Sequence, residues 1–125
     1  MQGIDYQKLA MRTNDGNHSI RLQNALDENR FLRDVPELLN GCLGLAGECG
    51  EFLDMVKKWI YHEKPLDEEH LQKELGDVLW YAAMICKAMK WDLDVVMAKN
   101  IAKLKARYPE GFDTDLSNHR KEGDL

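Results

Sequence analysis

Apolar residues recur every three or four positions along three stretches of the chain, and this spacing is typical of amphipathic α-helices. We therefore predict three long helices, at about residues 35–61, 67–90 and 92–108. Asp34 precedes the first of them as a cap, and Pro36 is tolerated in a first helical turn. Asp67 and Asp92 are the expected caps of the other two. No segment shows the alternation typical of a strand, so the sequence predicts an all-α fold.

The two ends of the chain carry weaker patterns. Asp5 is the expected cap of a first short helix, which ends near a turn signal at residues 14–17. Residues 18–35 fit either a short helix or an ordered loop. The last residues are polar. We therefore divide the chain into a domain over residues 1–112 and a polar, mobile C-terminal tail over residues 113–125.

Two pairs of acidic residues flank the apolar stripes of the first two long helices. At about 100° per residue, Glu51 lies about 60° from Glu48, and the Glu74–Asp77 pair has the same offset. The apolar positions expected to form the core are Leu45, Phe52, Val56, Ile60, Leu71, Leu75, Val78, Ala82, Ile85 and Met89. If the stripes pack together, four carboxylates converge at the rim of the core. Because uncompensated charges there are costly, the arrangement indicates a site for hard cations.

Glycine recurs at every third position inside the first long helix, at Gly41, Gly44, Gly47 and Gly50. Each glycine costs a helix about 1 kcal/mol relative to alanine, so four of them require an explanation. One explanation is a break in the helix near Asn40. The other is the close approach of another backbone, or room for phosphates beside the carboxylates.

Composition narrows the class of protein. With 125 residues the chain fits one domain, and its net charge of -5 argues against a general nucleic-acid binder. No stretch is long enough to span a membrane and no apolar signal region is present, so a cytoplasmic protein is the simplest expectation. Cys42, Cys49 and Cys86 lack metal-type spacing and lie near the apolar faces, which predicts buried thiols.

Three segments together resemble the MazG-like all-α nucleoside triphosphate pyrophosphohydrolases: Gly44–Glu51, Glu74–Tyr81 and Lys103–Pro109. The resemblance covers about residues 37–112. It implies Mg-dependent hydrolysis of a nucleoside triphosphate to a monophosphate and pyrophosphate. It also implies a helical bundle whose four-helix core is completed by oligomerisation, as a homodimer or a homotetramer. The glycine pattern is part of the resemblance, which favours the second explanation for it.

The resemblance and the spacing together assign a metal site to Glu48, Glu51, Glu74 and Asp77, with Mg2+ as the natural ion and Mn2+ as an alternative. Some relatives carry a further acid immediately before the first of these residues, where this chain has Gly47. Glu48 is therefore the candidate for the general base.

Candidate substrate-binding residues lie on all three long helices. Asn100, Lys103 and Arg107 line one edge of the last helix. Such a row is usually solvated, whereas the resemblance predicts contacts with the triphosphate, for which lysine supplies a point charge and arginine a fork. Tyr81, one turn beyond the second acidic pair, is either an ordinary half-buried tyrosine or a residue that orders the ligand. Trp59 either packs in the core or stacks on a base.

Two further residues and two rival functions complete the prediction. Trp80 points away from the core stripe, which indicates a subunit interface. His70 lies one turn before Glu74 and is left outside the site, because lone histidines there are more often exposed. Gly47 leaves open a non-catalytic helical regulator that binds nucleotide or metal. An iron-binding four-helix protein would carry Glu-x-x-His motifs, which neither acidic pair forms.

Overall fold

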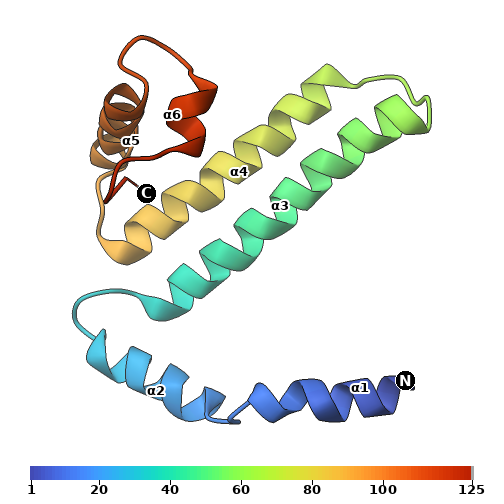
Figure 1. Ribbon diagram of the computed structural model, residues 1–125, viewed down its shortest axis with the longest axis vertical. Coiled ribbons are helices and arrows are strands. Elements are labelled where there is room, and N and C mark those ends of the chain that lie inside the picture. The colour runs from blue at the N-terminus through green and yellow to red at the C-terminus, as the bar shows by residue number, and fades with distance from the viewer. Residues whose placement is uncertain (125) are drawn as a thin grey trace.

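The computed structural model describes residues 1–124 and consists of helices joined by short loops (Figure 1). The elements are α1 (Gly3–Ala10), the 3-10 helix η1 (Met11–Thr13), α2 (His18–Glu28), α3 (Val35–Tyr61), α4 (Glu68–Met89), α5 (Leu93–Arg107) and α6 (Thr114–Asn118). No strand occurs within residues 1–124, and the all-α prediction is confirmed. None of the described helices is both long enough and apolar enough to cross a membrane.

The three long helices begin at the predicted caps. The Asp34 side chain accepts a hydrogen bond from the Glu37 amide at 2.9 Å, and Asp67 and Asp92 cap α4 and α5 in the same way. Pro36 lies in the first turn of α3, where its missing N–H leaves no helical bond unmade. α3 then continues for 27 residues through all four glycines. The alternative of a break near Asn40 is therefore wrong.

The antiparallel pair of α3 and α4 forms the centre of the molecule (Figure 1). Their seam contains the most buried residues of the chain, Gly41, Cys86 and Ala88. A Cβ at Gly41 would lie 2.8 Å from Cγ1 of Ile85, and one at Gly44 would overlap the ring of Tyr81. Close approach of α4 therefore explains these two glycines. Gly47 and Gly50 have no neighbour within 4 Å of such an added carbon among the described residues.

Polar contacts hold the start of α3 against the end of α4, the end of the hairpin where the chain enters and leaves. The Asp34 amide donates to the Ala88 carbonyl at 2.9 Å. Lys87 Nζ donates to both carboxylate oxygens of Glu37, at 2.9 and 3.0 Å. These contacts join the start of α3 to the last turn of α4, and they set the register in which the two apolar stripes meet.

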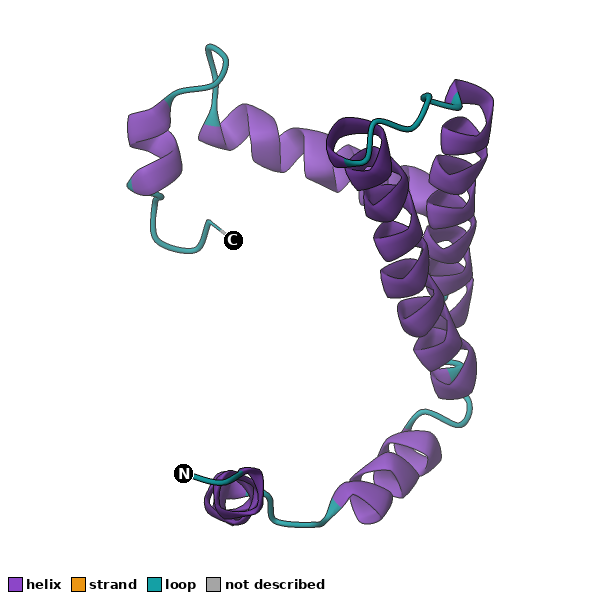
Figure 2. Ribbon diagram, turned by 90° about the vertical axis from the view of Figure 1, so that its right-hand side faces the viewer, coloured by secondary structure: helices purple, strands orange, loops and turns teal. Residues whose placement is uncertain are grey.

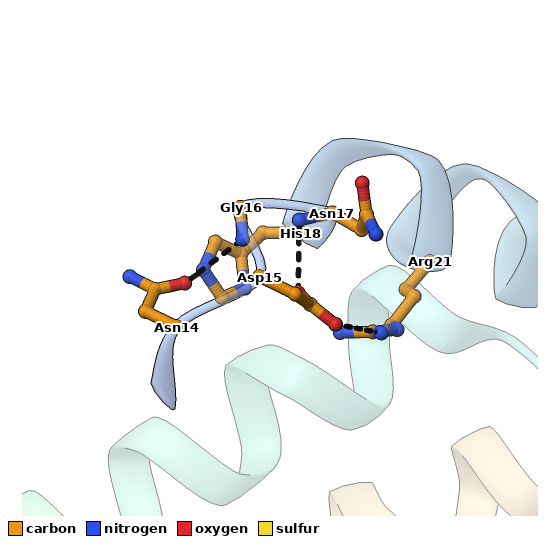
Figure 3. Close-up of polar contacts among 6 residues, drawn as sticks. All are labelled: Asn14, Asp15, Gly16, Asn17, His18 and Arg21. Atoms are coloured by element: carbon orange, nitrogen blue, oxygen red, sulfur yellow. Dashed lines mark hydrogen bonds and ion pairs between the residues drawn. The ribbon is translucent and has the colours of Figure 1, made fainter. Parts of the chain in front are cut away.

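The N-terminal segment follows the predicted order of helix, turn and helix. α1 starts one turn earlier than expected, with Gln2 as its cap; Asp5 lies in the first turn, where its charge still favours the helix dipole. At the turn, the Gly16 amide donates to Asn14 and the Arg21 guanidinium pairs with Asp15 (Figure 3). Residues 18–28 adopt the helical alternative, as α2.

Both arms of the chain leave the hairpin on the same side, α1 and α2 on one arm and α5 and α6 on the other (Figure 2). Large apolar side chains stay exposed on both arms, among them Ile4 at 67% and Ile101 at 51%. The predicted apolar face of α5 is therefore present but uncovered in the single chain. The solvent-accessible surface is 10526 Å².

The exposed side chains contradict the prediction that all three thiols are buried, and they agree with the predicted outward position of Trp80. Cys86 is buried, whereas Cys42 and Cys49 are exposed, because α4 covers only one side of α3. The prediction of three buried thiols is therefore wrong for the single chain. Trp80 is 60% exposed and points away from the seam as predicted.

The C-terminal segment is more structured than a polar tail. Asp113 accepts hydrogen bonds from the amides of Asp115 and Leu116 and so caps α6. The chain then returns to α5, where Asp124 pairs with Arg107. The sequence pattern alone shows neither feature, since one is a helix of five residues and the other joins positions 17 residues apart.

Candidate active site

Three of the four predicted metal ligands meet across the seam of the hairpin. Glu48 projects from α3, and Glu74 and Asp77 project from consecutive turns of α4. One oxygen from each of these three carboxylates lies within 4.8 Å of the others. We call Glu48, Glu74 and Asp77 the carboxylate triad. The i, i+3 spacing of the two α4 residues places both on the side of the helix that faces Glu48.

Two oxygens of the triad are buried without a partner. When both groups are ionised, Oε2 of Glu48 and Oε2 of Glu74 have no hydrogen-bond donor among the described residues. A buried, unpartnered carboxylate oxygen is costly, so the triad fits a group that supplies positive charge at this point. Hard divalent cations such as Mg2+ accept oxygen ligands of this kind. The residues present therefore fit a divalent metal.

Within the triad, the surroundings of Glu48 shift the pKa of its carboxyl group. Burial is the main cause that raises the pKa of Glu48, followed by hydrogen bonding with the Glu74 carboxyl group and by the negative charges of Glu51 and Asp77; together they raise the pKa of Glu48 to about 7. In the metal-free protein Glu48 therefore keeps its proton to a higher pH than an ordinary glutamate does. A cation in the triad would displace that proton, because it stabilises the charged form.

Two neighbours of the triad differ from the prediction. Glu51 is exposed and does not belong to the group of carboxylates within 4.8 Å, although its charge acts on Glu48. His70 was left outside the predicted site, yet its Nε2 lies 3.0 Å from Oε1 of Glu74. The i, i+4 spacing of this pair was the only sign of the contact in the sequence. His70 therefore contacts Oε1 of Glu74, whereas Oε2 of the same carboxylate is buried.

The predicted aromatic residues lie outside the triad. The ring of Tyr81 rests on Gly44 and meets Trp80 edge-on, with 5.0 Å between ring centroids. Tyr81 therefore packs the seam one turn beyond Asp77. Trp59 lies three turns along α3 from Glu48 and is 45% exposed. Trp59 is therefore not packed in a core within the single chain, and its stacking on a base stays a prediction.

The structure does not bring the polar row of α5 to the triad of the same chain. Within residues 1–124, α5 does not pack extensively on either helix of the hairpin, and Figure 2 shows it leading away from them. Asn100 and Lys103 are exposed on α5, whereas the Arg107 side chain is only 9% exposed. A cavity of about 370 Å³ lies between Lys103 and Arg107 of α5 and residues 116–124 of the C-terminal segment, which also line it.

The hairpin therefore carries three converging carboxylates that could hold a metal ion, and α5 carries a separate row with Asn100, Lys103 and Arg107. Residues 38–112, which contain both, match the family described as MazG nucleotide pyrophosphohydrolase domain. The chain belongs to the MazG family. The resemblance stated from the sequence is thereby confirmed, together with its all-α fold.

A viral protein is among the relatives of this MazG domain. The chain is 36% identical to the Gene 37 protein of Mycobacterium phage L5 over 82 residues, which are 62% of this chain and 72% of the phage protein. No solved structure was found to match the chain. Membership in the MazG family places the chain among nucleotide pyrophosphohydrolases, and the geometry of the triad agrees with the divalent metal that this chemistry uses.

Proposed function

We propose that this protein is a Mg-dependent pyrophosphohydrolase that converts a nucleoside triphosphate into a monophosphate and pyrophosphate. The observation that carries the proposal is the carboxylate triad with its two buried, unpartnered oxygens. An isolated acidic cluster on a helix surface would hydrate both oxygens and would need no ion. The family match supplies the class of substrate.

We assign separate roles in metal binding and proton transfer to the acidic residues of the site. Glu48, Glu74 and Asp77 would hold the ion, and Glu51, from the next turn of α3, is proposed as a further ligand. When bound, Mg2+ neutralises charge on the phosphates and acidifies a coordinated water. Glu48 is the proposed acceptor for the proton of the attacking water, because a bound cation would keep its carboxylate ionised beside the coordinated water. Attack at the α-phosphorus then expels pyrophosphate, whose charge needs cationic partners.

The protein is proposed to act as a homo-oligomer. A compact monomer of 14.5 kDa exposes about 6,900 Å², whereas this chain exposes 10526 Å². The excess is several times the roughly 800 Å² that each partner buries in a standard interface. The apolar side chains exposed on α1 and α5, together with Trp80, are the surfaces that we propose a second copy covers. Light scattering should return a dimer or a tetramer; a monomer at micromolar concentration would contradict the proposal.

Oligomerisation also supplies the missing half of the site. Because α5 leads away from its own hairpin, Asn100, Lys103 and Arg107 are proposed to meet the phosphates bound at the triad of another copy. Lysine and the arginine fork then stabilise the leaving pyrophosphate from the side opposite the carboxylates. The substrate-binding role of these residues stays a proposal, as does a cytoplasmic location.

A panel of normal and modified nucleoside triphosphates, incubated with Mg2+ and resolved by product chromatography, tests the function directly. The proposal expects equal amounts of monophosphate and pyrophosphate from at least one member of the panel. The same panel with Asp77→Ala serves as control for contaminating activity. Absence of turnover on every nucleotide, together with retained nucleotide binding, would support the non-catalytic regulator instead.

A further inference from the structure

Arg107, at the end of α5, is held by the carboxylate of Asp124, 17 residues further along the chain. Its Nε and Nη2 donate to the two oxygens of Asp124, each at 2.8 Å. The Arg107 side chain is 9% exposed and that of Asp124 is 18% exposed. Ion pairs on open surfaces contribute little, but this one is bidentate and shielded from water, which makes it one of the stronger kinds.

The local backbone of the C-terminal segment directs Asp124 to this position. Gly123 has a φ of +82°, a left-handed conformation that side chains rarely adopt. The Asp124 amide donates to the Lys121 carbonyl at 3.0 Å, which closes the turn. The turn reverses the chain so that the Asp124 carboxylate faces the guanidinium. The contact is therefore formed by a defined turn and not by a chance approach of two long side chains.

The surroundings of Asp124 have the chemistry of an anion site. Lys103, Arg107, His119 and Lys121 line the cavity of about 370 Å³ beside it, together with the acidic Glu122. The hydrogen bonds from Arg107 hold the pKa of Asp124 below its usual value, and the charges of Arg120 and Lys103 act in the same direction. A carboxylate and a phosphate present the same pair of oxygens to a guanidinium fork, so only one of them can occupy it.

We propose that Asp124 is a built-in competitor of the substrate triphosphate, and that the C-terminal segment is an autoinhibitory latch over Arg107. The inference rests on the proposed role of Arg107 in phosphate binding. In the free protein the Asp124 carboxylate occupies the fork; a bound triphosphate displaces it, and residues 119–124 move away from α5. Ligands with a single phosphate have too little charge to open the latch, which favours release of the monophosphate product.

Binding of inorganic triphosphate to the full chain, in the presence of Mg2+, tests the latch without depending on turnover. Asp124→Asn removes the competing charge and should tighten binding by about tenfold, because the closed latch no longer has to be opened. Asp115→Asn is the matched control: it makes the same change in the same segment, but Asp115 is 81% exposed and pairs only with His119 among the described residues. This variant should bind as the unmodified protein does.

A second variant and a second measurement separate the latch from a structural role. Gly123→Ala strains the left-handed turn without changing charge, and it should also tighten binding, which keeps the test valid if Asp124→Asn fails to fold. In the unmodified protein, inorganic triphosphate should speed hydrogen exchange at the Asp124 amide, whose bond to Lys121 is lost on opening. If Arg107 only anchors the segment, the exchange rate would stay constant.

The outcomes distinguish failure of the latch from failure of the proposed activity. If nucleotides are turned over but Asp124→Asn binds inorganic triphosphate no more tightly than Asp115→Asn, the latch is wrong and the function stands. If Asp124→Asn binds tenfold more tightly but no nucleotide is turned over, the function is wrong and the latch stands. Absence of inorganic triphosphate binding in every variant would overturn the latch.

Discussion

Replacing Gly44 by alanine tests how closely α3 and α4 approach at the seam. The added carbon would fall among the ring atoms Cδ1, Cε1 and Cζ of Tyr81, so the ring has to move. Trp80 limits that movement, because its ring meets Tyr81 edge-on at 5.0 Å. The neighbouring glycines offer matched controls: an added carbon at Gly47 or Gly50 meets no described atom within 4 Å.

Two opposing terms set the size of the effect. Alanine favours a helix over glycine by about 1 kcal/mol, which applies at all three positions. Overpacking a seam costs about 1–3 kcal/mol, and because three ring atoms are displaced, Gly44→Ala should lie at the upper end. The net expectation is a loss of about 1–2 kcal/mol for Gly44→Ala and a gain of about 1 kcal/mol for each control.

Thermal unfolding followed by circular dichroism, at one protein concentration and without nucleotide, measures both effects. For a chain of this length, 1 kcal/mol corresponds to roughly 4 °C in Tm. Gly44→Ala should therefore lower Tm by roughly 4–8 °C, whereas Gly47→Ala and Gly50→Ala should each raise it by roughly 4 °C. If Gly44→Ala raised Tm as much as the controls do, the close approach of Tyr81 to α3 would be refuted.

Three further predictions concern the carboxylate triad. With nucleotide present, Mg2+ should raise Tm because it binds the native state preferentially, and Asp77→Ala should abolish that rise in a melting experiment; an unchanged wild-type curve would count against the site. Without Mg2+, the folded state holds the Glu48 proton more tightly than the unfolded state, whose pKa is near the ordinary 4.5. The stabilisation is complete below pH about 4.5 and is lost as pH rises through about 7, so denaturant titrations should show falling stability in this window and a flatter profile for Glu48→Gln. In kinetic and binding assays Glu48→Gln should bind nucleotide yet lose most turnover, whereas Lys103→Ala should weaken binding as well; equal turnover in Glu48→Gln would exclude it as the base.

Local signals were sufficient to predict the long helices and the position of the triad. Asp34, Asp67 and Asp92 each cap their own helix, and capping depends only on the next two or three residues. The placement of Glu48 opposite Glu74 followed from helical periodicity once the two apolar stripes were assumed to pack together. These predictions needed no information about distant parts of the chain.

Features that depend on distant parts of the chain could not be predicted in the same way. Cys42 lies near an apolar face, but its exposure depends on which side of α3 is covered by α4. The pairing of Arg107 with Asp124 depends on a left-handed turn at Gly123, and a glycine near the end of a polar segment is too common to indicate one. Glu51 is exposed and lies outside the triad, and periodicity alone does not determine which of two acids on one helix face meets the carboxylates of α4.

In the proposed reaction, water attacks the α-phosphorus of a nucleoside triphosphate at the carboxylate triad. Turnover in oxygen-18 water, followed by mass spectrometry of both products, tests it most directly. Attack at the α-phosphorus should leave one labelled oxygen in the monophosphate and none in the pyrophosphate. Label in pyrophosphate, or release of orthophosphate in place of pyrophosphate, would contradict it, because attack would then have occurred at another phosphorus.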